Sequence, residues 1–166
     1  NDNCGSATSL TVNAPLLCSQ SLDNGTTQTG ECQLGYASGS SESVWYRFTT
    51  TNSQMILNYI QTKIGVFSTT VRVYGPYAPG TGCVPSCGAA IYNQTQNGDP
   101  GSYITLSGLS TTGNNQYLIQ IEDGDPNGGP NVSGRRFCIG VYTVAPNNTS
   151  STGTIIAVSY THLRAH

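Results

Sequence analysis

The chain has 166 residues, enough for one domain with a hydrophobic core and too few for two domains of ordinary size. Only 8% of the residues are charged and the formal net charge is -2, so the clustered Lys and Arg that bind nucleic acid are missing. No apolar run approaches the roughly 18 residues that a membrane-spanning helix requires.

Strands are predicted where apolar and polar residues alternate, because successive side chains of a strand point to opposite faces. In chain order, we expect strands at Thr8–Val12, Ser43–Thr51, Gln54–Thr62, Thr70–Tyr74, Ala89–Tyr92, Ser102–Leu106, Asn115–Glu122 and Arg136–Val144. The Pro- and Gly-rich segments Gly75–Cys87 and Asn93–Gly101 are expected to be exposed loops. Parallel sheets need long crossovers, which are usually helical, and no helical period separates these segments. We therefore predict an all-β fold: an antiparallel two-layer β-sandwich, jelly-roll-like, with about eight strands.

The sandwich domain is expected to cover residues 1–145 and to be followed by a linker at 146–153, P-N-N-T-S-S-T-G. Residues 154–166 would then be an extra strand, the start of a next module, or a strand donated to a neighbouring copy. The apolar residues of such a strand are Ile155, Ile156 and Val158. The last eight residues, S-Y-T-H-L-R-A-H, resemble a translated sequencing adapter. Since the chain begins at Asn1 rather than Met, we expect a mature or excised piece of an exported protein.

Six cysteines are present, at Cys4, Cys18, Cys32, Cys83, Cys87 and Cys138. Their even number favours disulfides, and the absence of C-x-x-C pairs and of nearby histidines disfavours a metal site. Disulfides imply an oxidising compartment, so we expect a secreted or cell-surface protein. Spacing alone does not determine the pairing. Our expectation is Cys4–Cys18, Cys83–Cys87 and a long-range Cys32–Cys138 bridge.

Four short motifs carry a family resemblance: N-D-N-C-G-S-A-T-S-L at 1–10, S-V-W-Y-R-F-T at 43–49, V-R-V-Y at 71–74 and Q-Y-L-I-Q-I at 116–121. They resemble the extracellular N-D-x-C modules of Bacteroidota-type surface proteins, which are similar to bacterial pre-peptidase C-terminal domains. The resemblance implies a jelly-roll-like sandwich, export, and an accessory role in adhesion, substrate targeting or assembly. The family often has F-D-T where this chain has Phe67-Ser68-Thr69, so any role of that acid is not carried over.

One acidic segment follows the strand expected at Asn115–Glu122. Asp123, Asp125 and Asn127 would present several oxygen ligands to calcium from a single turn. The same residues are also common in plain turns, because they tolerate positive φ. Both interpretations stay open. Asp2 is a second candidate ligand, since the N-terminus resembles the calcium segment of pre-peptidase domains. No cofactor other than calcium is expected.

Catalysis is not expected. Both histidines lie in the last five residues, so neither a serine nor a cysteine nucleophile has a proton shuttle in the body of the domain. A pair of carboxylates could in principle hydrolyse glycosides. The candidates, none of which has a distinguishing context, are Glu31, Glu42, Glu122, Asp99, Asp123 and Asp125.

Aromatic side chains could instead form a platform for sugar rings. The candidates are Trp45, Tyr46, Tyr74, Tyr77, Tyr92 and Tyr103. Trp45 and Tyr46 lie within a strand and are better explained by packing, whereas Tyr77 follows Gly75-Pro76 and is the best exposed candidate.

We therefore predict a non-catalytic secreted or cell-surface module for adhesion, ligand binding or assembly within a larger extracellular protein. Its partners would be an extracellular glycan, a protein surface or copies of itself, and we expect neither nucleic-acid binding nor a membrane span. The alternative is a structural subunit of an extracellular filament or surface layer, built by strand pairing between copies. Low charge supports the alternative, because repulsion between copies is small.

Overall fold

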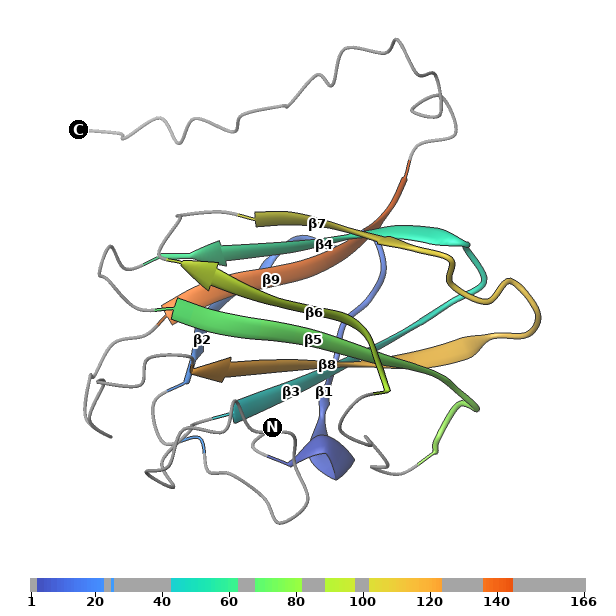
Figure 1. Cartoon of the computed structure of the whole chain (residues 1–166), viewed down its shortest axis with the longest axis horizontal. Helices are drawn as coiled ribbons and strands as arrows, with labels where there is room; N and C mark the ends of the chain where they lie inside the picture. Colours follow the sequence, from blue (N-terminus) through green and yellow to red (C-terminus); the bar gives the residue numbers. More distant parts are fainter. Residues whose placement is uncertain are drawn as a thin grey trace, which may run out of the picture.

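The computed structural model describes residues 3–22, 25, 43–62, 68–81, 89–97, 102–123 and 136–144. In these ranges a single 3-10 turn, η1, and nine strands form (Figure 1). Their bounds are η1 Cys4–Ser6, β1 Thr8–Ser9, β2 Leu17–Ser21, β3 Ser43–Thr50, β4 Gln54–Gln61, β5 Ser68–Tyr77, β6 Ala90–Asn97, β7 Ser102–Ser107, β8 Asn115–Asp123 and β9 Arg136–Thr143. None of the described ranges contains a helix that is long and apolar enough to cross a membrane.

The strands form two sheets. The five-stranded sheet has the order β1-β3-β8-β5-β6, and the four-stranded sheet has the order β2-β9-β4-β7. All of their strand pairs are antiparallel except β1 with β3. The predicted all-β sandwich is therefore confirmed.

The core lies between the two sheets and consists of alternate residues from both. The five-stranded sheet contributes Val44, Tyr46, Phe48, Val71, Val73, Tyr117, Ile119 and Ile121, and the four-stranded sheet contributes Met55, Leu57, Tyr59, Ile104, Leu106, Phe137, Ile139 and Val141. Aromatic rings pack against one another within the core. Phe48 stacks on Tyr117 with a distance of 5.3 Å between ring centroids, and the centroids of Tyr59 and Phe137 are 5.2 Å apart. The alternating apolar residues from which the strands were predicted are thus the residues that point into this core.

The structure differs from the predicted strands at four places. β2 was not predicted, because L-C-S-Q-S does not alternate. β1 has only two residues and pairs parallel with β3. β5 continues through the cis Gly75–Pro76 bond to Tyr77, with a shift of register against β8 between Tyr74 and Tyr77. β6 extends to Asn97, into a segment predicted to be a loop, because backbone pairing at a sheet edge does not require apolar side chains.

One disulfide joins Cys18 of β2 to Cys138 of β9, across 120 positions of sequence. These two strands are antiparallel neighbours, and their register shifts between Leu17 and Gln20. Ser19 lies within this shift and has a positive φ of 62°. Such an irregularity, with an extra residue on one strand, is a β-bulge. It places Cys18 beside Cys138.

The expected pairings Cys4–Cys18 and Cys32–Cys138 are therefore wrong. Cys4 is itself disulfide-bonded, but not to Cys18. The physical reason is that the pairing of β2 with β9, and not nearness along the chain, brings the two sulfurs together. The expected Cys83–Cys87 pairing lies outside the described residues.

Candidate functional site

The outer face of the five-stranded sheet, which points away from the core, is itself largely buried. Trp45, Tyr74 and Leu118 pack there with Cys4 and Ala7 of the N-terminal segment as a second, smaller apolar cluster. The rings of Trp45 and Tyr74 are 5.8 Å apart. Both faces of the central strands of this sheet are therefore removed from solvent.

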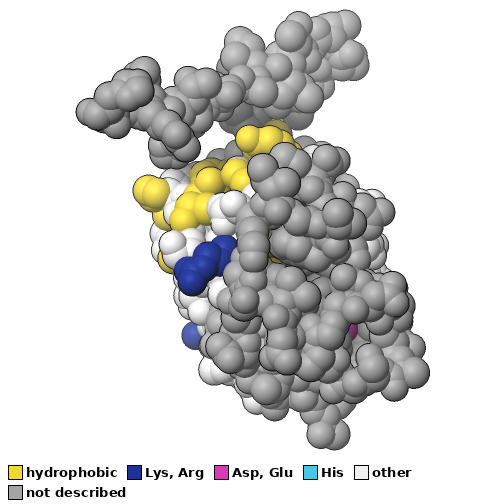
Figure 2. All heavy atoms as spheres, turned by 90° about the vertical axis from the view of Figure 1, so that its left-hand side faces the viewer, with side chains coloured by type: hydrophobic (Ala, Val, Ile, Leu, Met, Phe, Trp, Pro, Cys, Tyr) yellow, Lys and Arg dark blue, Asp and Glu magenta, His cyan; other side chains and the backbone are white. Residues whose placement is uncertain are grey.

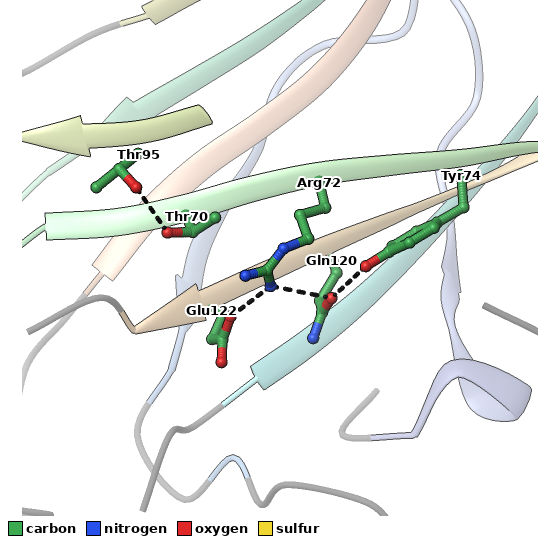
Figure 3. A network of polar contacts seen from close by, with 6 residues as sticks. All are labelled: Thr70, Arg72, Tyr74, Thr95, Gln120 and Glu122. Carbon is green, nitrogen blue, oxygen red and sulfur yellow. Dashed lines mark hydrogen bonds and ion pairs between the residues drawn. The ribbon is translucent and has the colours of Figure 1, made fainter. Parts of the chain in front are cut away.

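Polar side chains occupy the same outer face beside this cluster (Figure 3). Arg72 of β5 forms an ion pair with Glu122 of β8, and its Nη1 also donates to Gln120 Oε1 at 3.4 Å. The hydroxyl of Tyr74 donates to the same oxygen at 2.9 Å. The side chains of Arg72 and Glu122 are only 6% and 1% exposed. This network ties β5 to β8 and holds a buried charge pair.

Sequence reasoning treated Glu122 only as one of several carboxylates or as part of a turn. The structure instead pairs it with a cation at Arg72, on the neighbouring strand of the sheet. The sequence did contain a signal: each of two largely apolar predicted strands carries one charged residue, Arg72 in one and Glu122 in the other. A charge that is buried with its strand requires a partner of opposite sign, so the two residues could have been paired.

The aromatic candidates separate by burial. Trp45, Tyr46 and Tyr74 are fully buried, so they are not available as a platform for a ligand. Tyr77, the candidate we favoured, is partly buried and packs against the cluster of Trp45, and burial raises the pKa of its phenol. Tyr92 is partly buried against the core. Tyr103 is the exposed member, with 70% of its surface open to solvent.

Tyr103 belongs to the outer face of the four-stranded sheet. We define the tyrosine face as Ile56, Asn58 and Ile60 of β4, Tyr103 of β7 and Tyr142 of β9. Asn58 is directly opposite Tyr103 on one side and Gly140 on the other, and Ile56 is opposite Tyr142. In Figure 2, apolar side chains gather near the top of the described part of the molecule, at the height of β7 and β4 in Figure 1.

Gly140 makes room for the ring of Tyr142. A Cβ atom at position 140 would lie 2.9 Å from the phenol oxygen of Tyr142 and 3.0 Å from a methyl carbon of Leu16. Tyr142 therefore lies along β9 over this glycine. Burial raises the pKa of Tyr142 above the usual 10.0, and the charge of the nearby Tyr103 is a second, smaller cause of this increase. Tyr103 thus lies close enough on this face to affect the ionisation of the Tyr142 phenol.

Asn58 lies at the centre of the tyrosine face and is only 8% exposed. Its Oδ1 is buried, and no residue of the described ranges donates a hydrogen bond to it. A buried acceptor without a donor costs about 1 to 3 kcal/mol, so such an atom is uncommon and calls for an explanation. Sequence reasoning missed Asn58, Gly140 and Tyr142, because their proximity depends on the register of β4 between β7 and β9.

Several predicted site residues lie outside the described part. These are the calcium candidates Asp2, Asp125 and Asn127, the cysteines Cys32, Cys83 and Cys87, and the strand-donation residues Ile155, Ile156 and Val158. Asp123 is the last residue of β8. Among the described residues, no three His, Cys, Asp or Glu side chains group as a metal site would require.

The chain matches no protein-family model, no curated protein and no solved structure.

Proposed function

We propose that this chain is a non-catalytic, exported binding module of a larger extracellular protein, and that its tyrosine face binds a glycan. Export is supported by the Cys18–Cys138 disulfide, because disulfides persist in oxidising compartments. The observation that carries the binding proposal is the exposed ring of Tyr103 directly opposite Asn58, whose Oδ1 has no hydrogen-bond partner in the described part of the chain.

An exposed tyrosine on a strand is well suited to hold a sugar ring. Its flat ring offers an apolar surface to the C–H face of the sugar, and its hydroxyl remains available for hydrogen bonds. The backbone of β7 is fixed by six consecutive residue pairs with β4, so the ring is presented by a rigid element. The flanking Ile56 and Ile60 are half-buried and extend the apolar surface.

Asn58 supplies the polar component. Oδ1 is closed to solvent in its present position, so the Asn58 side chain would have to turn outward to accept a hydrogen bond from a sugar hydroxyl and recover the free energy of the unmade bond. The low overall charge of the chain, 8% charged residues, suits a neutral ligand. Binding sites for small ligands commonly combine apolar rings with a few polar groups that fix orientation, and the tyrosine face has this combination.

The experiment is affinity electrophoresis of the full chain through gels that contain xylan, mannan, a soluble β-glucan or a cellulose derivative. We expect at least one polysaccharide to retard the chain, and Tyr103→Ala to weaken that binding roughly fivefold, as expected for an aromatic contact of about 1 kcal/mol. Tyr103→Phe should retain most of the affinity, because it keeps the ring.

The matched control is Ile91→Ala, which removes another exposed large apolar residue, 48% exposed, from the opposite sheet. It should leave retardation unchanged. The proposal fails if none of the polysaccharides retards the chain, or if Tyr103→Ala and Ile91→Ala reduce retardation equally.

A second candidate function, a filament or layer subunit, is favoured by the sheet edges. β6, A-I-Y-N-Q-T-Q-N, and β7, S-Y-I-T-L-S, each end a sheet and contain neither a charged residue nor a proline. Proteins usually protect edge strands with such residues, because an open edge pairs with other chains. Light scattering and electron microscopy of the full chain test this function. Concentration-dependent assemblies that Ile91→Lys abolishes would support it, and a monomer at every concentration would refute it.

A further inference from the structure

A pocket of about 320 Å³ lies at the β1 edge of the five-stranded sheet, separate from the tyrosine face. Arg47 and Thr49 of β3 line it together with Gln116 of β8, which is directly opposite Thr49. Ser9, Leu10, Phe48 and Gly80 complete its described lining. The volume is at the small end of the range of ligand sites, roughly 300 to 1,000 Å³.

Gly80 reaches the pocket from the turn that follows β5. This turn is closed by a hydrogen bond from the Thr81 N–H to the Ala78 carbonyl, at 3.0 Å. The buried amide of Gln116 holds it, since Gln116 Oε1 accepts from the Gly80 N–H and Nε2 donates to the Thr81 carbonyl, each at 3.3 Å. One wall of the pocket is therefore fixed by a side chain of the sheet.

Arg47 is the charged residue of this pocket. Its Nε donates to the Ser9 hydroxyl at 2.9 Å, which holds the guanidinium end of the side chain, and its backbone carbonyl accepts from the Leu10 N–H at 2.8 Å, which fixes the backbone. Within the described residues, its terminal nitrogens Nη1 and Nη2 form no hydrogen bond or ion pair. Glu122, the one acid whose side chain the structure describes, is already paired with Arg72. The charge of Arg47 is thus left without a counterion in that part of the chain.

We propose that this pocket binds the carboxylate of a single acidic sugar residue, such as a uronic acid. A guanidinium presents parallel N–H donors that match the two oxygens of a carboxylate, and such charge-assisted pairs are about twice as strong as neutral hydrogen bonds. Anchoring through Nε leaves the two terminal nitrogens of Arg47 for this purpose. The hydroxyls of Ser9 and Thr49, both exposed, face ring hydroxyls of the sugar. This site is independent of the tyrosine face, so either binding proposal can be refuted without refuting the other.

The test is a titration of the 15N-labelled full chain, followed through the amide resonances of Thr49 and Gly80. The probes are D-glucuronate, D-glucose, which has the same ring without the carboxylate, and N-acetylglycine, a carboxylate without the ring. We expect glucuronate to shift both resonances saturably, and glucose and N-acetylglycine to bind at least about tenfold more weakly. That ratio corresponds to about 1.4 kcal/mol for the missing contacts.

Arg47→Gln should weaken glucuronate binding at least about tenfold, as loss of a charge-assisted pair predicts. The matched control is Arg136→Gln, the same change at the exposed first residue of β9, which should leave the affinity unchanged. Equal weakening by both variants would show general charge attraction and overturn the proposal. Glucose or N-acetylglycine binding as tightly as glucuronate would overturn it as well, and this comparison needs only the unmodified chain.

Discussion

Replacing Arg72 by Gln leaves the carboxylate of Glu122 buried without its cation. Both side chains are nearly inaccessible, 6% and 1% exposed, so solvent screens their interaction little. Removing one partner of a buried ion pair costs about 3 to 5 kcal/mol, mainly because the remaining buried charge loses its counterion. For a domain of this size each kcal/mol lowers the melting temperature by about 2 to 4 °C. We therefore expect Arg72→Gln to melt roughly 10 °C below the unmodified chain.

The assay is urea and thermal unfolding of Arg72→Gln beside Arg136→Gln. The second variant makes the same chemical change at an exposed position, and it should alter the free energy of unfolding by less than about 0.5 kcal/mol. Equal losses in the two variants would refute the assignment of a buried pair.

Three further predictions concern the disulfide, the tyrosine face and the outer face of the five-stranded sheet. Replacing Cys18 and Cys138 by Ser opens a bridge that spans 120 positions, and loop entropy predicts a loss of about 5 kcal/mol in urea unfolding; a loss below about 1 kcal/mol would contradict it. The Tyr142 phenol should titrate above 10.0 by NMR. Tyr103→Phe should lower the pKa of Tyr142 but should not restore the usual value, because burial, the larger cause of the shift, remains. The unfolded chain releases the Tyr142 proton at a lower pH than the folded chain does. The protonated phenol therefore contributes to stability in full below pH 10.0, and this contribution is lost as the pH rises through the pKa of Tyr142 in the folded chain. Trp45, the single tryptophan, should show blue-shifted emission that iodide does not quench until the chain unfolds.

The strands could be predicted from the sequence because the alternation of side chains is a local property. Val44, Tyr46 and Phe48 share one face whatever β3 pairs with, and the need to bury that face requires a second layer. The same argument holds for the run from Tyr117 to Ile121 in β8. The all-β sandwich was therefore determined by the sequence alone.

The candidate sites were decided by tertiary structure, because they depend on which strands are neighbours and on what covers each outer face. The alternation is the same for a strand with an open outer face and for one buried on both faces, so it did not distinguish the exposed Tyr103 from the buried Tyr74. Register likewise placed Cys18 beside Cys138 and Asn58 opposite Tyr103. The sequence by itself determined the layers of this protein, and the pairing of distant strands determined its bridge, its buried charges and its exposed tyrosine face.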